Sequence, residues 1–135
     1  MERYRAIKRR YWGDMENRHH ILFNRRQHSI DPNNRYLRNN AGLIVPMDYD
    51  AHTELHKNCP LVPPLPEHLA QFVLSQIKPR RGDYLGNMDK FLLATERAIK
   101  HPRTHVIEKE LAKVTLHAVE IQKPFIQDGA IWNVA

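Results

Sequence analysis

The stretch AHTELHKN, residues 51–58, sets His52 and His56 four positions apart, with no proline or glycine between them. Asp48 or Asp50 can cap a short helix that holds this stretch. Residues four apart lie one turn apart on the same face of a helix. The spacing therefore predicts two imidazoles that can bind one metal ion from the same side.

The same spacing also separates His101 from His105. Nine histidines in 135 residues make such coincidences common, so a spacing needs structural context before it indicates a site. Pro102 and Thr104 mark a helix boundary between these two histidines. Their side chains therefore need not share one helix face.

Two short apolar runs upstream of residues 51–58 predict strands. HILF (20–23) is β-prone, and LIVP (43–46) is a second run that is closed by its proline. The chain between them carries turn clusters at residues 31–34 and 39–42, and we predict a long loop there. The expected order is strand, long loop, strand and helix.

A tandem pair, His19 and His20, stands at the first run, within RHHILFNRR (18–26). Adjacent residues on a strand point to opposite faces, so only one histidine of the pair should face a metal. The usual imidazole pKa lies near neutrality, so the other histidine can accept a proton from water. The pair thus fits one metal ligand beside one general base.

Four prolines in CPLVPPLP (59–66) must stop the helix, because proline lacks an N–H donor and restricts the residue before it. We predict an extended spacer here and place the internal boundary of the chain in it.

Beyond this spacer the apolar positions recur with a helical period. We predict three amphipathic helices: one over 66–78, one capped by Asn87 and ended by Pro102, and one that begins at Thr104. Core packing is the expected role of their apolar stripes, and binding of a protein partner is the alternative. The stripe of the third helix consists of Ile107, Leu111, Val114, Ala118 and Ile121.

The composition sets further limits. The single cysteine, Cys59, excludes an internal disulfide and a cysteine-rich zinc module. The formal net charge of +6 favours a polyanionic partner, and residues 1–18 are basic enough to form an arm that touches phosphates. The sequence has no signal peptide and no apolar run of membrane length, so we expect a soluble intracellular protein.

Together these motifs resemble the HNH (ββα-metal) nucleases, in particular the colicin DNase branch. That branch has a tandem His-His at its first strand, a second strand and a His-x-x-x-His helix. The sequence is also similar to small HNH-like proteins of actinobacterial phages, with their HHLLF-R-R start, H-x-x-LH helix and proline-rich exit. The matching pieces here are RHHILFNRR, GLIVP, HTELH and CPLVPPLP, so the resemblance covers residues 18–66.

The resemblance implies that His19, His52 and His56 are metal ligands and that His20 is the general base. The divalent ion would be Mg²⁺ or Zn²⁺, with Mn²⁺ or Ni²⁺ as further candidates, and would stabilise charge on the scissile phosphate and the departing 3′ oxygen. The products would carry a 5′ phosphate and a 3′ hydroxyl.

Three arginines close to the tandem histidines suit phosphate clamping through bidentate hydrogen bonds. They are Arg18, Arg25 and Arg26. Ordinary surface charge at the end of a strand is the alternative for each of them.

The chain departs from the HNH pattern just before the second strand, where these nucleases carry an asparagine that fixes the loop orienting the base. That place falls on Gly42, whereas Asn39 and Asn40 lie two or three residues earlier. Asn39 and Asn40 are therefore the candidate loop-fixing residues. If neither reaches back, His20 would be poorly aligned and catalysis slow or absent, so binding without cleavage stays an alternative.

The sequence thus predicts an α+β fold, a small ββα-metal unit followed by an α-helical C-terminal extension of about three helices. Its parts are a basic arm (1–18), the HNH-like unit (19–58), the proline-rich spacer (59–66) and the helical extension (67–135). The expected function is that of a metal-dependent DNA endonuclease of phage or bacterial type. It would act on DNA in the cytoplasm of a bacterial host cell, away from membranes.

Several alternatives stay open. A degenerate HNH scaffold could bind a phage packaging protein or a host protein through its C-terminal helices. A non-catalytic protein could bind DNA through the basic arm. The histidines could close a structural zinc with four ligands, or lie on the surface of a metal-free fold.

Overall fold

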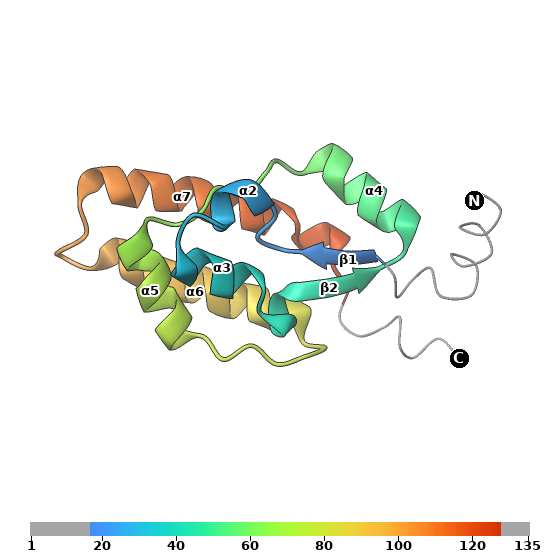
Figure 1. Cartoon of the computed structure of the whole chain (residues 1–135), viewed down its shortest axis with the longest axis horizontal. Coiled ribbons are helices and arrows are strands. Elements are labelled where there is room, and N and C mark those ends of the chain that lie inside the picture. Colours follow the sequence, from blue (N-terminus) through green and yellow to red (C-terminus); the bar gives the residue numbers. More distant parts are fainter. Residues whose placement is uncertain (1–16, 128–135) are drawn as a thin grey trace.

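The computed structural model describes residues 17–127, and its fold is α+β, as predicted. Its elements in chain order are β1 (Asn17–His20), α2 (Arg25–His28), α3 (Pro32–Arg38), the 3-10 turn η1 (Ala41–Leu43), β2 (Ile44–Met47), α4 (Tyr49–Asn58), α5 (Glu67–Gln76), α6 (Tyr84–Lys100), α7 (Val106–Ile121) and the 3-10 turn η2 (Lys123–Phe125). The two strands lie at one end of an elongated molecule, with α4 beside them, and the turn between α6 and α7 lies at the other end (Figure 1). Except for its last two residues, the predicted arm (1–18) lies outside the described residues.

The sheet consists of β1 and β2 in antiparallel pairing, with His19 opposite Val45 and His20 opposite Ile44. The first strand begins and ends earlier than predicted, because the apolar run 21–23 enters the core after one last hydrogen bond from the Ile21 N–H to the Leu43 carbonyl. Its apolar character therefore reflects burial and not strand pairing. The second strand is shifted by one residue from the prediction and contains Pro46.

The predicted long loop between the strands is wrong, because it contains the helices α2 and α3. Asp31 caps α3: its carboxylate accepts a hydrogen bond from the N–H of Asn34 at 3.0 Å, and Pro32 occupies the first turn. Asp, Pro and Asn serve helix starts as well as turns, so the cluster 31–34 alone did not distinguish the two.

The helix predicted around residues 51–58 is confirmed as α4. The carboxylate of Asp48 accepts a hydrogen bond from the N–H of Ala51 at 2.7 Å, which caps the first turn. Leu55 is fully buried and anchors the helix on the core. This anchor fixes the face of α4 that carries the two histidines.

The proline-rich segment 59–66 is extended and packs into the core, with Val62 and Leu65 buried. The Asn34 amide donates a hydrogen bond to the Leu65 carbonyl at 2.8 Å and accepts one from the Leu65 N–H at 3.0 Å. The N–H of Val62 also donates to the Phe23 carbonyl. The segment thereby joins the part of the molecule that contains the two-stranded sheet to the C-terminal helices in one continuous core.

The C-terminal half forms three principal helices, as predicted, with α6 packed against both α5 and α7. The predicted cap of the second helix is wrong: α6 begins at Tyr84, and Asn87 is buried inside its first turn. The helix ends before Pro102, as expected. None of the helices within residues 17–127 has the length and apolarity that a membrane crossing requires.

The predicted apolar stripe of α7 is only partly in the core. Ile107, Leu111 and Val114 are 75%, 52% and 54% exposed. The face that α7 buries carries smaller side chains, namely Ala112, Thr115, Ala118 and Val119. Small residues let α7 approach the proline-rich segment closely, and the Thr115 hydroxyl donates to the Pro63 carbonyl at 2.9 Å.

Candidate metal centre

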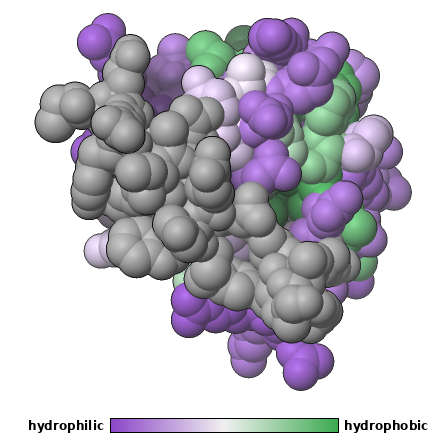
Figure 2. Space-filling model, turned by 90° about the vertical axis from the view of Figure 1, so that its right-hand side faces the viewer, coloured by the Kyte–Doolittle hydropathy of each residue, from purple (hydrophilic) through white to green (hydrophobic). Residues whose placement is uncertain are grey.

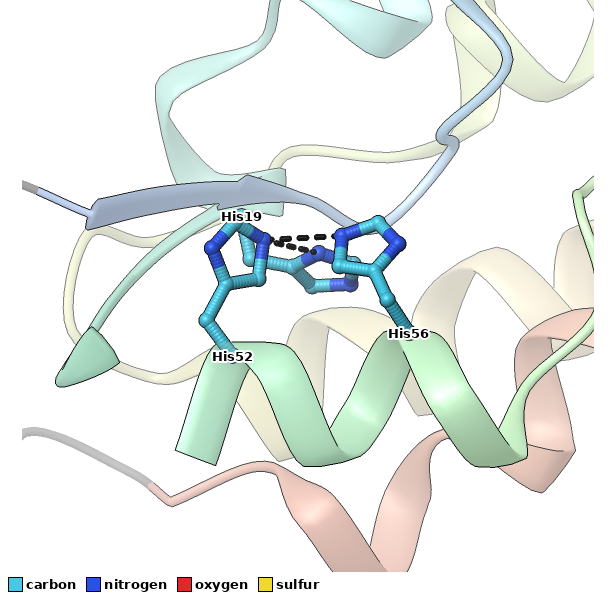
Figure 3. A group of neighbouring side chains, drawn as sticks. All are labelled: His19, His52 and His56. Atoms are coloured by element: carbon cyan, nitrogen blue, oxygen red, sulfur yellow. Dashed lines mark hydrogen bonds between the residues drawn. The ribbon is translucent and has the colours of Figure 1, made fainter. Parts of the chain in front are cut away.

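Three of the predicted ligands meet in space. His19 Nδ1 lies 3.3 Å from His52 Nε2, and His56 Nε2 lies 2.9 Å from the same His52 atom (Figure 3). One ring nitrogen from each of these side chains lies within 4.8 Å of the other two. Among the described residues this is the one group of histidine, cysteine or carboxylate side chains that could hold a metal ion.

The local structure explains this convergence. Alternation along β1 turns His19 toward α4 and buries it to 1% exposure, while Arg18 beside it is exposed. Helical spacing stacks His52 and His56 one turn apart on α4, with their ring centroids 4.6 Å apart. The four-residue spacing and the strand alternation are therefore sufficient to bring these three side chains together.

A buried glutamine fixes the orientation of the His19 ring. Gln122, just after α7, donates from its amide nitrogen to the Ile21 carbonyl at 2.8 Å, so its amide oxygen faces His19. His19 Nε2 lies 2.6 Å from that oxygen and must donate to it. The proton of the neutral ring is then on Nε2, and the lone pair on Nδ1 points at the other two imidazoles.

The two histidines of α4 also have partners. His52 Nδ1 lies 3.4 Å from the Asn17 side-chain oxygen, which places its proton on the outer nitrogen and leaves Nε2 as the inner lone pair. The ring of Phe23 packs edge-on against His56, with centroids 4.6 Å apart. Such outer contacts set the rotation of metal-ligating imidazoles in known metal sites.

The distances between the inner nitrogens agree with ligation of one ion. Zn–N bonds of about 2.0–2.1 Å in a tetrahedral arrangement would separate two ligand nitrogens by about 3.3–3.4 Å. The measured separations, 3.3 Å and 2.9 Å, lie at and slightly below this range. The lone pairs of His19 Nδ1 and His52 Nε2, which lie 3.3 Å apart, repel each other without an ion, so these two rings fit a cation between them.

Burial keeps these imidazoles neutral. Burial is the largest cause that lowers the pKa of His19. The Gln122 hydrogen bond partly opposes it, the positive charges that His52, His56 and His20 can carry add to the lowering, and the resulting pKa is about 3. Burial also lowers the pKa of His52 and of His56 below the usual histidine value. All three rings therefore present lone pairs at neutral pH, as metal ligation requires.

The centre is closed on one side and open on the other. His19 is buried beneath it, His52 is half-buried, and His56 is exposed. Figure 2 shows the end of the molecule that carries α4 and the two strands, and the surface of the described residues on this face is mostly hydrophilic. Three protein ligands with solvent on one side are typical of catalytic zinc sites, whereas structural sites are closed by four ligands. His20 does not join the ligand group, so the alternative of four histidines around one structural zinc is not formed.

His20 lies on the opposite face of β1 and is half-buried. Burial, as the largest cause, and the positive charges of Arg38, Arg25 and His52 together lower its pKa to about 4. Because the charge of His52 lowers the pKa of His20, His20 lies close enough to the metal centre for charges there to affect it, although the two imidazoles face different sides of β1.

The arginine cluster beside His20 differs from the predicted one. Arg18, Arg25 and Arg26 are all exposed, and of these only Arg25 contributes to the pKa of His20. Arg38, which the sequence analysis did not single out, contributes more than Arg25. Its Nε is buried without a hydrogen-bond partner among the described residues, and its own pKa is lowered by burial and by Arg25.

The predicted loop-fixing residues do not reach His20. Asn40 caps η1 by accepting a hydrogen bond from the Gly42 N–H at 2.9 Å, and Asn39 accepts one from Arg38 at 3.2 Å. The loop is held instead by Asn87 of α6, whose amide donates to the Gly42 carbonyl at 2.6 Å. A Cβ at position 42 would stand 2.3 Å from the Pro79 Cβ, so a glycine is required here.

The same buried amide ties this loop to the chain before α6. Asn87 also donates to the Arg80 carbonyl and accepts a hydrogen bond from the Arg80 N–H, both at 2.8 Å. The loop that precedes β2 is thus fixed from the C-terminal half of the chain.

Besides Arg38, the sequence analysis missed the positioning roles of Asn87 and Gln122. Each of these two residues is a buried amide in an otherwise apolar helical pattern. A polar side chain at a core position is the signal that could have singled out Gln122, but not its partner 103 positions away. Cys59 is not part of the centre: burial raises the pKa of its thiol, which points at the Ile121 carbonyl.

Comparison with protein-family models, with curated proteins and with solved structures finds no match to this chain. Function is therefore inferred from the side chains themselves. They combine three neutral imidazoles arranged for one cation, a further neutral imidazole on the next residue, and two arginines beside it.

Proposed function

We propose that this protein is a metal-dependent DNA endonuclease of the HNH type. The observation that carries the proposal is the convergence of His19, His52 and His56, with one ring nitrogen of each within 4.8 Å of the other two and one side open to solvent. A tandem histidine on the first strand and a His-x-x-x-His helix produce this convergence, and these are the motifs of the HNH resemblance.

The three imidazoles would hold a divalent cation, Mg²⁺ or Zn²⁺, with Mn²⁺ or Ni²⁺ as further candidates. Such an ion supplies a Lewis acid that stabilises charge on the scissile phosphate and on the departing 3′ oxygen. The hydrogen bond from His19 to Gln122 holds the buried ligand in place, so the binding geometry is formed before the ion arrives.

His20 is the proposed general base. Its lowered pKa keeps the ring neutral at pH 7, and a neutral imidazole can take a proton from water. A bound phosphate adds negative charge beside the ring and raises its pKa toward neutrality. The base would therefore become stronger when DNA is present, and cleavage would leave a 5′ phosphate and a 3′ hydroxyl.

Arg25 and Arg38 are the proposed phosphate-binding residues of this face. The ion pairs of the described residues, Lys113–Glu110 and Lys123–Asp89, lie elsewhere, so neither arginine is neutralised by a carboxylate. Clustered cations without an acidic partner favour a bound phosphate. Contacts of this kind are made to the DNA backbone and confer little sequence preference.

Plasmid nicking in the presence of Mg²⁺, Mn²⁺, Ni²⁺ or Zn²⁺ tests the proposal. His20→Ala and His56→Ala should each abolish cleavage, while the metal affinity should be unchanged in His20→Ala and at least about tenfold lower in His56→Ala. His117→Ala, an exposed histidine on α7, is the matched control and should cleave normally. No cleavage by the folded wild-type protein with any of these ions would overturn the enzymatic proposal.

A second candidate function is that of a protein-binding module with a degenerate HNH scaffold. It is favoured by the exposed apolar residues Ile107, Leu111 and Val114 on α7, which no other part of residues 17–127 buries. The partner would be a phage packaging protein or a host protein. This candidate predicts that Leu111→Ser abolishes partner capture while His20→Ala does not, whereas the nuclease predicts the opposite pattern for DNA cleavage.

A further inference from the structure

A cavity lies far from the metal centre, at the end of the molecule where the chain turns from α6 into α7 (Figure 1). Its volume is about 390 Å³, within the range of small-molecule sites. Residues from α5, the end of α6 and the start of α7 line it. No described residue of the metal centre takes part.

The base of this cavity is apolar. Leu69 and Ala98 are buried and Phe72 is half-buried, so they form the part of the lining that lies deepest. Together they offer an aromatic ring and two aliphatic side chains to the body of a ligand.

The mouth of the cavity is rich in nitrogen donors. His68, His101, His105 and Arg103 line it, and all four are exposed. His101 and His105 do share a site after all, because the turn between the helices brings them to one cavity. His101 Nδ1 accepts a hydrogen bond from the Arg103 N–H at 3.1 Å, so the neutral ring carries its proton on Nε2 as a further donor.

One acidic side chain, Glu108, belongs to the lining. Its carboxylate accepts a hydrogen bond from the His105 N–H at 3.2 Å, which orients it toward the start of α7, and it keeps its negative charge. The guanidinium of Arg103 has no carboxylate partner among the described residues' ion pairs. Arg103 and the imidazole N–H groups are therefore the donors to which a negatively charged group can bind.

We propose that this cavity binds a small organic anion, with an apolar or aromatic body against Leu69, Phe72 and Ala98 and a carboxylate or phosphate group at Arg103 and the imidazoles. The proposal is independent of the nuclease. A cation of the same shape would be repelled by Arg103 at the mouth. An inorganic anion has no apolar body, so it would leave Leu69, Phe72 and Ala98 in contact with water and should bind less tightly.

Four probes test the ligand class on the full-length protein by NMR titration. 4-Phenylbutyrate and phenyl phosphate share an aromatic body with an anionic group, and 4-phenylbutylamine is the cationic counterpart. Inorganic phosphate is the anion without a body. At least one of the two aromatic anions should give saturable shifts of the ring protons of His68, His101 and His105 at millimolar concentration. The amine and inorganic phosphate should not, and the rings of His52 and His56 should not respond.

Substitutions locate the anionic group. Arg103→Gln should weaken binding of the aromatic anion about tenfold, the size expected for loss of one charged hydrogen-bond donor. Arg97→Gln, an exposed arginine on α6 outside the lining, should change it less than about twofold. Absence of binding by both aromatic anions would overturn the proposal. So would equal binding of the amine, or unchanged affinity in folded Arg103→Gln.

Discussion

His19 in the first strand and Gln122 after the last long helix are joined by a hydrogen bond of 2.6 Å across 103 positions of the chain. The same glutamine donates to the Ile21 carbonyl, so one side chain fixes both a candidate metal ligand and the backbone two residues beyond it. The geometry of the metal centre therefore depends on the C-terminal half of the molecule, which contributes no ligand.

Gln122→Leu should weaken metal binding by about 10–100-fold, as expected when the outer partner of a metal-bound imidazole is lost. The free energy of unfolding should fall by about 1–3 kcal/mol, because two buried polar groups lose their partner. Isothermal titration with Zn²⁺ and urea denaturation measure the two effects. The exposed Gln76→Leu is the control, and equal metal affinity in both variants would show that Gln122 does not position His19.

The wild-type protein should bind one Zn²⁺ or Co²⁺ ion per chain. His52→Ala and His56→Ala should each lower the affinity at least about tenfold, since each removes one of three ligands. His52 and His56 are not fully buried, so both variants should remain folded, as circular dichroism can check. Stoichiometric binding that persists in the double variant would place the metal site elsewhere.

Gly42→Ala should destabilise the fold by about 1–3 kcal/mol, because the added methyl group overlaps the side chain of Pro79. Gly86→Ala is the matched control: its methyl group meets only the flexible carboxylate of Asp83, and alanine favours a helix. Urea denaturation should show a clear loss for position 42 and a change below about 1 kcal/mol for position 86. Similar losses at both positions would contradict the close packing of this loop.

Without metal, the protein should lose stability as the pH falls below the usual histidine value of 6.5. Burial lowers the pKa of His19 and of His28 in the folded state, so the unfolded chain binds protons that the folded chain rejects. The stability is fully present above pH 6.5 and declines toward the folded pKa values.

Urea midpoints in the presence of a chelator, at about pH 7.5, 6.0 and 5.0, measure this dependence in a window where carboxylates contribute little. Saturating Zn²⁺ should make the decline steeper, because protons then also displace the ion from its ligands. A midpoint that stays constant or rises toward pH 5.0 would show that these histidines titrate normally in the folded protein.

Arg38→Gln should weaken binding of a short DNA duplex several-fold and reduce the salt dependence of binding by about one charge. Arg35→Gln, an exposed arginine on the same helix, should have a smaller effect because it lies outside the cluster beside His20. Fluorescence anisotropy at two or more salt concentrations gives both quantities. Equal effects of the two substitutions would indicate general charge attraction and not a phosphate site.

The parts of the fold that local chemistry determines could be predicted from the sequence. The helix α4 has a capping aspartate, helical spacing of its histidines and a proline-rich stop, and it forms where these signals place it. Strand alternation indicated that one histidine of the tandem pair should face a metal, and the HNH resemblance named His19, which does lie beside His52 and His56. The helix depends on neighbours in the chain, whereas the convergence of His19 with α4 joins residues 33 positions apart and was expected only through the resemblance.

Features that depend on distant contacts could not be predicted in this way. Asn87 looked like a helix cap because asparagine favours that position, yet it is buried because it satisfies the backbone of two loops. The pattern of α7 allowed either of two faces to be buried. Close packing of Thr115 on the Pro63 carbonyl selects the face with small residues and leaves Leu111 exposed.

Pro46 in β2 has a consequence for the behaviour of the protein in a crowded cell. It stands opposite Arg18. The hydrogen bond from the Ile21 N–H to the Leu43 carbonyl makes these two residues a hydrogen-bonded pair, and such pairs alternate with non-hydrogen-bonded pairs along antiparallel strands. The backbone N and C=O of position 46 therefore face away from β1. The outer edge of β2 therefore lacks a donor at its centre. A strand from another molecule could not extend the sheet there, which protects the edge of the two-stranded sheet from edge-to-edge aggregation.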